Sequence, residues 1–195
     1  MTQTLPGPDG KLRCAWCLST PEYIAYHDDD WGMPVADDRD LFERLSLEAF
    51  QAGLSWRLIL EKREGFQVAF DGFDPVLVAG FGAIDVQRLL DDPGIVRHRG
   101  KIEATITNAR RLLEMQQTRS FAAYLWSHEP AAGQGQAVAS VLSKDLKKRG
   151  WAFVGPTTVY AFMQAIGMVN DHAPDCHQHA RTEAARAAFV RPVLR

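Results

Sequence analysis

Cysteine is scarce in this chain of 195 residues, which contains Cys14, Cys17 and Cys176 and no others. So few cysteines, and an odd number of them, argue against a disulfide framework. They favour a reducing compartment, in which metal binding is a more common use of cysteine than disulfide formation. We therefore predict a cytoplasmic protein without structural disulfides.

Long apolar runs are also lacking. No segment approaches the roughly 20 apolar residues that cross a bilayer, so we predict no membrane partner. Residues 1–10 are polar and lack the apolar stretch of a signal peptide, and we interpret residues 1–12 as a flexible tail. No convincing alternation of apolar and polar residues is present, and no internal repeat, so the sequence predicts no sheet.

Helical patterns account for most of the chain, because apolar residues recur at helical spacing in segment after segment. The fold prediction is therefore all-α, with many short helices and short links. A polar helix is expected from His177 onward, and residues 128–137 are expected to form a flexible loop. The other main predicted helices cover about 38–51, 56–70, 75–80, 82–90, 100–116, 121–126, 139–149 and 155–167.

Charge is distributed unevenly along the chain. The formal net charge is −2, but residues 1–96 carry −9, residues 97–150 carry +6 and residues 151–195 carry +1. The basic middle segment is either a surface that binds a polyanion or a solvated helix face that complements the acidic part. Charge alone does not decide between the two.

The stretch from Leu47 to Trp56 combines a carboxylate, a glycine and an indole. Gly53 is interpreted as the stop of one helix, and Ser55 as the cap of the next. Glu48 adjoins an apolar stripe, where a glutamate is rarely buried without a partner. From this stretch alone, a Glu48 that reaches water at the edge of the stripe is favoured over a functional carboxylate.

Cysteine and histidine occur in two clusters more than 150 positions apart, one within 14–17 and one within 172–179. Thiolate and imidazole suit zinc, and four such ligands make a closed structural site. We favour this slightly over buried cysteines without a metal. The zinc-protease and zinc-deaminase motifs are absent, which argues against a catalytic zinc. Spacing leaves several residues competing as ligands: Cys17, His27, His177 and His179.

The segment Gly94–Lys101 connects two apolar helices and contains Arg97 and Arg99. Its glycines leave backbone N–H groups accessible next to a helix N-terminus, an arrangement that binds a DNA phosphate without reading sequence. A plain helix connection with exposed arginines is the alternative.

Six motifs together resemble the 3-methyladenine DNA glycosylase I family, within the helix-hairpin-helix DNA glycosylase superfamily. They keep the family's order and span about residues 13–176. Departures are small: Asp30 replaces the usual Glu, and Ala49-Phe50 and Ala173–Asp175 also differ. The motifs are RCAW (13–16), YHDxxWG (26–32), LExxQAGLSW (47–56), GIxRHRGKI (94–102), KKRGxxFVG (147–155) and MVNDH (168–172).

The resemblance implies one all-α glycosylase domain over residues 13–180. A zinc-tethered lobe (about 13–35 and 150–180) would join the chain ends, a helix-hairpin-helix lobe would cover about 36–149, and residues 181–195 would form a C-terminal tail. The implied structural Zn²⁺ ligands are Cys14, His27, His172 and Cys176.

The implied function is excision of N3-methyladenine from double-stranded DNA by a monomer. The residues Gln116–Ser120 include neither Asp nor Lys, so we predict a monofunctional enzyme without a Schiff-base step. The alternative is a non-catalytic, zinc-stabilised module that binds DNA damage. The implied catalytic residues are Glu48, Tyr26 and Trp56, the pocket residues are Trp16 and Tyr23, and the DNA-binding residues are Gln51, Gly53, Leu54, Gly94, Arg97, Arg99, Gly100 and Lys101.

Overall fold

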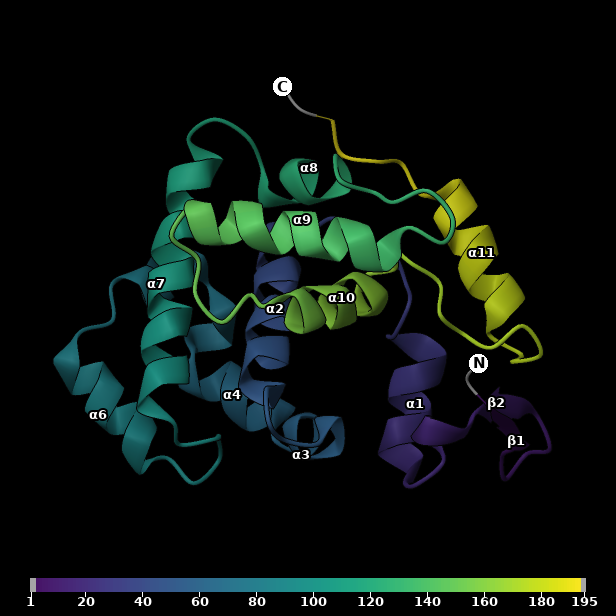
Figure 1. Ribbon diagram of the computed structural model, residues 1–195. Helices are drawn as coiled ribbons and strands as arrows, with labels where there is room; N and C mark the ends of the chain where they lie inside the picture. Colours follow the sequence, from purple (N-terminus) through teal and green to yellow (C-terminus); the bar gives the residue numbers. More distant parts are fainter. Residues whose placement is uncertain (1–2, 194–195) are drawn as a thin grey trace.

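The protein is built from packed helices, with one small β-hairpin at the N-terminal end (Figure 1). The computed structural model describes residues 3–193, and the all-α prediction is confirmed for the bulk of them. The elements are β1 (Thr4–Pro6), β2 (Leu12–Cys14), α1 (Pro21–Asp29), α2 (Asp38–Gln51), α3 (Trp56–Glu61), α4 (Arg63–Ala69), α5 (Pro75–Ala79), α6 (Ala83–Asp91), α7 (Arg99–Gln116), α8 (Phe121–Trp126), α9 (Gly135–Lys148), α10 (Pro156–Ala165) and α11 (His179–Ala188).

Local sequence signals set the helix boundaries. The Asp37 side chain accepts from the first backbone N–H groups of α2, and Ser55 accepts from the Leu58 N–H in α3. The predicted helix over 56–70 is divided, because Lys62 leaves helical geometry and separates α3 from α4. Helix α9 begins at Gly135, inside the predicted loop over 128–137.

Helix α2 is the centre of the fold. It contacts α3, α7, α8 and α10, and Figure 1 shows it running through the middle of the molecule. All its residues from Leu41 to Phe50 are buried except Arg44. Glu48 is itself buried, with the residue only 5% exposed, so the exposed edge position favoured from the local stretch is wrong.

The N-terminal hairpin is joined to the loop before α11, and here the structure differs from the predicted N-terminal tail. Strands β1 and β2 pair antiparallel with Thr4 opposite Cys14, where the sequence predicted a flexible tail over 1–12. Strands of three residues are too short for an alternating pattern to reveal them. The His177 N–H donates to the Leu12 carbonyl at 2.9 Å, and α11 confirms the polar helix expected from His177 onward, which extends into the region predicted as a C-terminal tail over 181–195.

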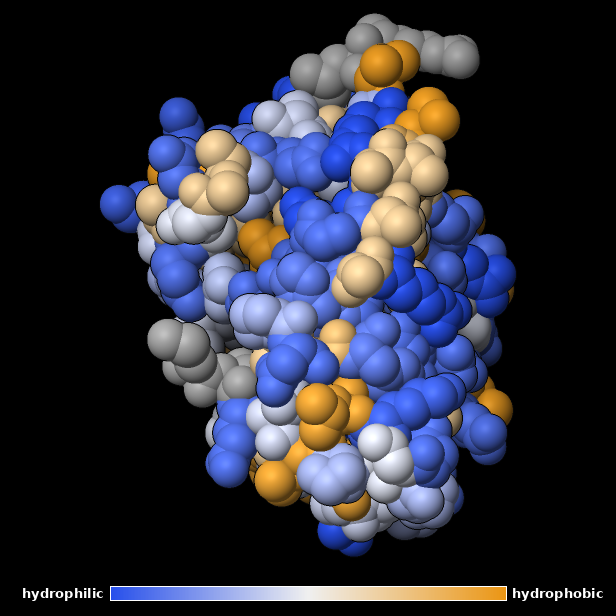
Figure 2. Space-filling model, turned by 90° about the vertical axis from the view of Figure 1, so that its right-hand side faces the viewer, coloured by the Kyte–Doolittle hydropathy of each residue, from blue (hydrophilic) through white to orange (hydrophobic). Residues whose placement is uncertain are grey.

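The face that includes α11 and the hairpin is mostly hydrophilic, and its hydrophobic patches are small and separate (Figure 2). Beyond α11, the Phe189 ring packs on Trp126 at 4.5 Å and Arg191 pairs with Glu129 at 2.7 Å. Within residues 3–193, no helix is both long enough and apolar enough to cross a membrane.

Candidate functional site

A cleft of about 560 Å³ opens where α1, α2, α3 and α10 meet the loop before α11. The implied catalytic and pocket residues converge on it, although they come from three helices and a 3-10 turn. Five aromatic and seven polar residues line its walls: Trp16, Tyr23, Tyr26, Trp31, Glu48, Gln51, Trp56, Gln164, Asn170, Asp171, His172 and His179.

Glu48 is the buried carboxylate of this cleft. The residue is 5% exposed, and no group in residues 3–193 donates a hydrogen bond to its carboxylate. Burial raises the pKa of Glu48 to about 8, and the Arg44 guanidinium one helical turn earlier offsets part of that rise. A carboxylate that is buried without a partner costs stability, so its place in a cleft marks it as a functional group.

Aromatic rings surround the space in front of Glu48. The Tyr26 and Trp56 ring centroids lie 5.3 Å apart, and Trp16 lies 5.1 Å from Tyr23. Burial raises the pKa of Tyr26 well above its usual range, so its phenol remains a neutral donor. Such walls suit a flat ring, above all one with positive charge.

A network of charges lies behind α2. Arg44 and Arg63 both bind the Asp30 carboxylate, and Arg63 also donates to Glu43 at 2.7 Å. Arg44 additionally donates to the Ala165 carbonyl of α10 at 3.2 Å. The network ties α1, α2, α4 and α10 together, so it fixes the backbone from which Glu48 projects.

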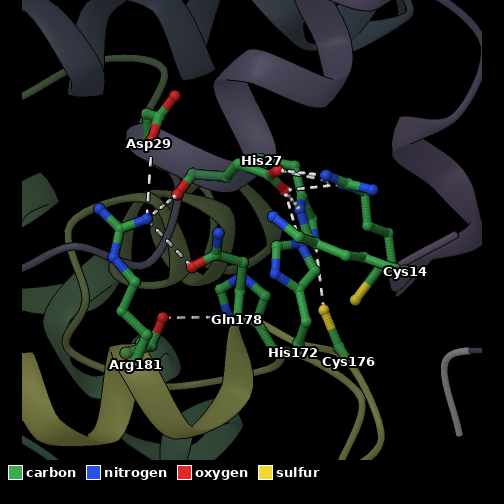
Figure 3. A network of polar contacts seen from close by, with 12 residues as sticks. Cys14, His27, Asp29, His172, Cys176, Gln178 and Arg181 are labelled. Carbon is green, nitrogen blue, oxygen red and sulfur yellow. Dashed lines mark hydrogen bonds and ion pairs between the residues drawn. The ribbon is translucent and has the colours of Figure 1, made fainter. Parts of the chain in front are cut away.

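Three of the four implied metal ligands converge beside the cleft. The ligand atoms of Cys14, His27 and Cys176 lie within 4.8 Å of one another, all buried, and could hold a metal ion. In Figure 3 the two sulfur atoms lie beside the imidazoles of His27 and His172. The ring centroids of His27 and His172 are 4.9 Å apart, so His172 borders this group.

Neighbouring side chains orient the His27 ring toward the sulfurs. Its Nδ1 lies 2.8 Å from Asp28, which leaves Nε2 facing the Cys176 Sγ at 3.5 Å. Arg13 holds the other side of the Asp28 carboxylate at 2.7 Å. At metal sites, the nitrogen of a ligating histidine that faces away from the metal is commonly hydrogen-bonded to a carboxylate, which fixes the orientation of the ring.

A second observation also supports a metal at these donors: the Nε2 nitrogen of His172 has no hydrogen-bond partner. Its Nε2 is buried without a hydrogen-bond partner, whereas its Nδ1 lies 2.9 Å from the Asn170 amide oxygen. A buried imidazole nitrogen with no partner is costly unless it binds something else. Among the competing residues, Cys17 is buried outside the group, and His177 lies 3.2 Å from Asp28.

The segment Gly94–Lys101, predicted to bind a DNA phosphate, runs from the loop after α6 into the first turn of α7 and is called the hairpin below, as distinct from the β-hairpin. Arg97 and Arg99 are exposed, and Gly94 packs so closely on α4 that a Cβ at Gly65 would meet its carbonyl oxygen at 2.5 Å. His98 caps α7 by accepting from the Lys101 N–H at 3.2 Å. The loop is therefore fixed while its arginines face solvent.

Lys101 has a different role from the predicted DNA contact. Its ammonium is buried and donates to the Phe50 carbonyl at 2.8 Å and to the Ala52 carbonyl at 2.6 Å. These carbonyls close the C-terminal end of α2, where a positive charge is favourable. Lys101 thus joins the hairpin to the bend that follows Glu48.

Replacing Lys101 with Met is expected to lower the free energy of unfolding by about 2–4 kcal/mol, because two carbonyls lose a charged donor. Urea denaturation followed by circular dichroism measures this. Lys144→Met on the exposed face of α9 is the matched control and should change stability by less than about 0.5 kcal/mol. A Lys101 variant as stable as the control would contradict the assigned role.

The bend between α2 and α3 projects from the rim of the cleft. Gly53 has φ of 82°, which favours glycine, and no atom lies within 4 Å of a Cβ built there. Leu54 is 38% exposed, unusual for a leucine next to a buried helix. The tip therefore offers an apolar side chain to a partner beside the cleft.

Two residues that line the cleft were not predicted as site residues. Trp31 is buried in a cluster with Tyr26 and Ala165, and it also borders the cleft and packs on His172 with ring centroids 4.6 Å apart. Asp171 also lines it, and its carboxylate accepts from Tyr160 and from Gln164, both at 2.6 Å. Both lie within family motifs, but their positions beside the cleft depend on how the loop after α1 packs against the loop before α11, which no local pattern predicts.

Comparison with known proteins shows which family has this arrangement. The family model for methyladenine glycosylase matches residues 16–179. DNA-3-methyladenine glycosylase 1 of Escherichia coli (strain K12) is 49% identical over 177 residues, covering 84% of this chain and 95% of the relative. A crystal structure of 3-methyladenine DNA glycosylase I (TAG) has 48% identity and a TM-score of 0.81, covering 86% of this chain and 99% of that one.

A structure of the Staphylococcus aureus 3-methyladenine DNA glycosylase I, which concerns recognition of 3-methyladenine, is 38% identical with a TM-score of 0.79. It covers 86% of this chain and 96% of that one. The predicted family and the predicted glycosylase fold are thus confirmed. The chain belongs to the methyladenine glycosylase family.

Proposed function

We propose that this protein is a monofunctional DNA glycosylase that excises N3-methyladenine from double-stranded alkylated DNA and acts as a monomer. The observation that carries the proposal is Glu48, a buried carboxylate without a hydrogen-bond partner in an aromatic cleft. Relatives that are 43–49% identical are named for 3-methyladenine excision, which supports the same substrate here.

Charge explains the choice of base. Methylation at N3 makes the adenine of a nucleotide cationic, whereas undamaged adenine is neutral. Because the pKa of Glu48 is raised to about 8, the empty cleft holds a mostly protonated Glu48 at neutral pH. A cationic ring bound in the cleft against Tyr26 and Trp56 favours the ionised carboxylate, so base entry releases a proton to solvent. Neutral adenine gains no such attraction.

The reaction needs little acid assistance once the base is bound. When the N-glycosidic bond breaks, its electron pair moves to the cationic ring, and the base leaves neutral. The sugar is left electron-deficient and takes up water, which loses a proton and yields an abasic site. Tyr26, Glu48 and Trp56 contribute by binding and orienting the ring, and extrusion of a damaged base costs less than that of an intact one.

The cleft also suits a monofunctional enzyme. No lysine is among its lining residues within 3–193, and Lys101 is engaged with backbone carbonyls. An amine is required to form a Schiff base with the sugar. We therefore expect borohydride to trap no covalent adduct between the protein and DNA.

The metal is proposed to be a structural Zn²⁺ held by Cys14, His27, Cys176 and His172. Thiolate and imidazole donors suit zinc, and the donor set leaves no open ligand position. When bound, the ion would supply a cross-link between the β-hairpin and the loop before α11. The protein residues that bind the base lie in the neighbouring cleft.

For DNA binding, we assign two regions. Gln51, Gly53 and Leu54 at the bend would fill the gap left by the extruded nucleotide. The hairpin would hold a phosphate through backbone N–H groups, with the exposed Arg97 and Arg99 adding charge. Gly100 keeps the backbone at the start of α7 accessible, whereas the Gly94 N–H donates to Asp92 at 2.7 Å and Gly94 would act by letting the loop pack closely on α4.

Base release tests the proposal. Duplex DNA treated with an SN2 methylating agent is incubated with the protein, and released bases are separated by chromatography. We expect 3-methyladenine well above a heat-inactivated control. Salt-dependent binding without release would instead support the non-catalytic damage-binding module.

A further inference from the structure

A loop beside the hairpin holds a bulky residue in a backbone conformation typical of glycine. Phe153, in the loop between α9 and α10, has φ of 55°. This left-handed region is unfavourable for a residue with a large side chain. The side chain is also 39% exposed, so deep burial does not compensate. Strain of this kind persists where the surrounding structure enforces it and is concentrated at functional sites.

Core residues hold both flanks of Phe153. The Asn108 side chain of α7 accepts from the Ala152 N–H at 2.8 Å and donates to the Ala152 carbonyl at 3.0 Å. On the other side, the Ser143 hydroxyl of α9 donates to the Val154 carbonyl at 2.6 Å. These three hydrogen bonds hold the residues on both sides of Phe153, so its conformation is imposed by α7 and α9.

In this conformation, the Phe153 ring packs against His98 and Gly100 of the segment Gly94–Lys101. Its centroid is 6.2 Å from that of His98, edge to face, and its Cζ lies 3.8 Å from where a Cβ on Gly100 would stand. His98 is the residue that caps α7 by accepting from the Lys101 N–H. The strained loop therefore touches the residue that orders the first turn of α7, where the hairpin offers its backbone N–H groups.

We propose that Phe153 is a positioning residue for DNA binding. Its ring keeps His98 in the capping position and thereby holds the hairpin amides ready for a DNA phosphate. The proposal rests on the proposed function, because it assigns Phe153 a part in DNA binding at that hairpin. A glycine at this position would relieve the backbone but would remove the ring that orders the hairpin.

Phe153→Gly in the full-length protein separates the two effects. We expect its thermal midpoint to equal or exceed that of wild type, because glycine accepts this φ. Its Kd for a duplex with a tetrahydrofuran abasic analogue, measured by fluorescence anisotropy, should rise about three- to tenfold, the range of an aromatic pair. Single-turnover excision at saturating DNA and binding of free 3-methyladenine should be unchanged. Phe153→Tyr, which keeps the ring, should bind the duplex like wild type.

Phe153→Ala keeps the backbone strain and should weaken duplex binding by a similar factor, so the readout does not depend on the glycine. Wild-type duplex affinity in both the Gly and Ala variants would overturn the proposal, as would equal weakening in the Tyr variant. The proposed function fails separately: wild-type protein that binds duplex but releases no base would defeat the glycosylase assignment and leave the role of Phe153 in binding standing.

Discussion

Glu48→Gln is expected to lower excision of 3-methyladenine by about a hundredfold or more, the usual effect of removing one preorganised charge-stabilising group. Gln keeps the size of the side chain but cannot ionise when the cationic base arrives. The loss should fall on the methylated base, because a neutral ring gains nothing from the carboxylate. Single-turnover release of 3-methyladenine from methylated duplex measures it.

The same substitution is expected to stabilise the protein. The pKa of Glu48 is raised from 4.5 to about 8 in the folded state. Between these values the folded protein binds more protons than the unfolded chain, so wild-type stability falls as pH rises. At about 1.4 kcal/mol per pH unit, the Gln variant should be roughly 3 kcal/mol more stable at pH 7 and close to wild type at pH 4.5.

Denaturation of both proteins at several pH values between 4.5 and 8 tests this dependence. Glu64→Gln, at an exposed position on α4, is the matched control and should show neither the gain in stability nor the loss of excision. A Glu48→Gln variant with wild-type activity and a pH-independent stability difference would show that Glu48 is a structural residue only.

Cys14→Ser should destabilise the protein by on the order of 4 kcal/mol, which for a chain of this size lowers the thermal midpoint by roughly 10 °C. The reason is that Cys14 links β2 to Cys176 and His27 through the proposed metal. Metal content of the purified protein, measured by mass spectrometry, should fall from about one zinc per chain to near zero. Chelation of wild-type protein should lower its midpoint in the same way.

Cys17→Ser is the control for this prediction. Cys17 is as buried as Cys14 but lies outside the metal group, so its replacement should leave metal content unchanged. Equal metal content in both variants would remove Cys14 from the ligand set. Loss of metal in the Cys17 variant alone would make Cys17 the metal ligand in place of Cys14.

Much of the helical framework follows from local sequence. Asp37 and Ser55 cap α2 and α3 and set where these two helices begin. The apolar spacing of α2, α7 and α8 indicates which segments are helical, because such signals act within one or two turns. The N-terminal strands were missed because three residues cannot show a period. The break at Lys62 was missed because the apolar pattern continues across it.

The site residues likewise divide into those that the sequence predicted and those whose role depends on distant contacts. Family motifs indicated Glu48, Tyr26 and Trp56, and the structure places them around one cleft. By contrast, nothing local distinguishes the buried Lys101 from the exposed Arg97 and Arg99 in the same basic stretch. Its orientation is decided by two carbonyls about fifty positions earlier, and contacts at that separation leave no trace in local composition.

The two hydrogen bonds of Lys101 also set a fixed spacing between two parts of the molecule. One ammonium spans the start of α7 and the end of α2, so the loop beside the arginines and the projecting Leu54 cannot move independently. In the proposed DNA complex, this link would hold the phosphate contact at the loop and the Leu54 side chain at a constant separation along the strand. The nucleotide tested for damage would then always lie at the same distance from the bound phosphate.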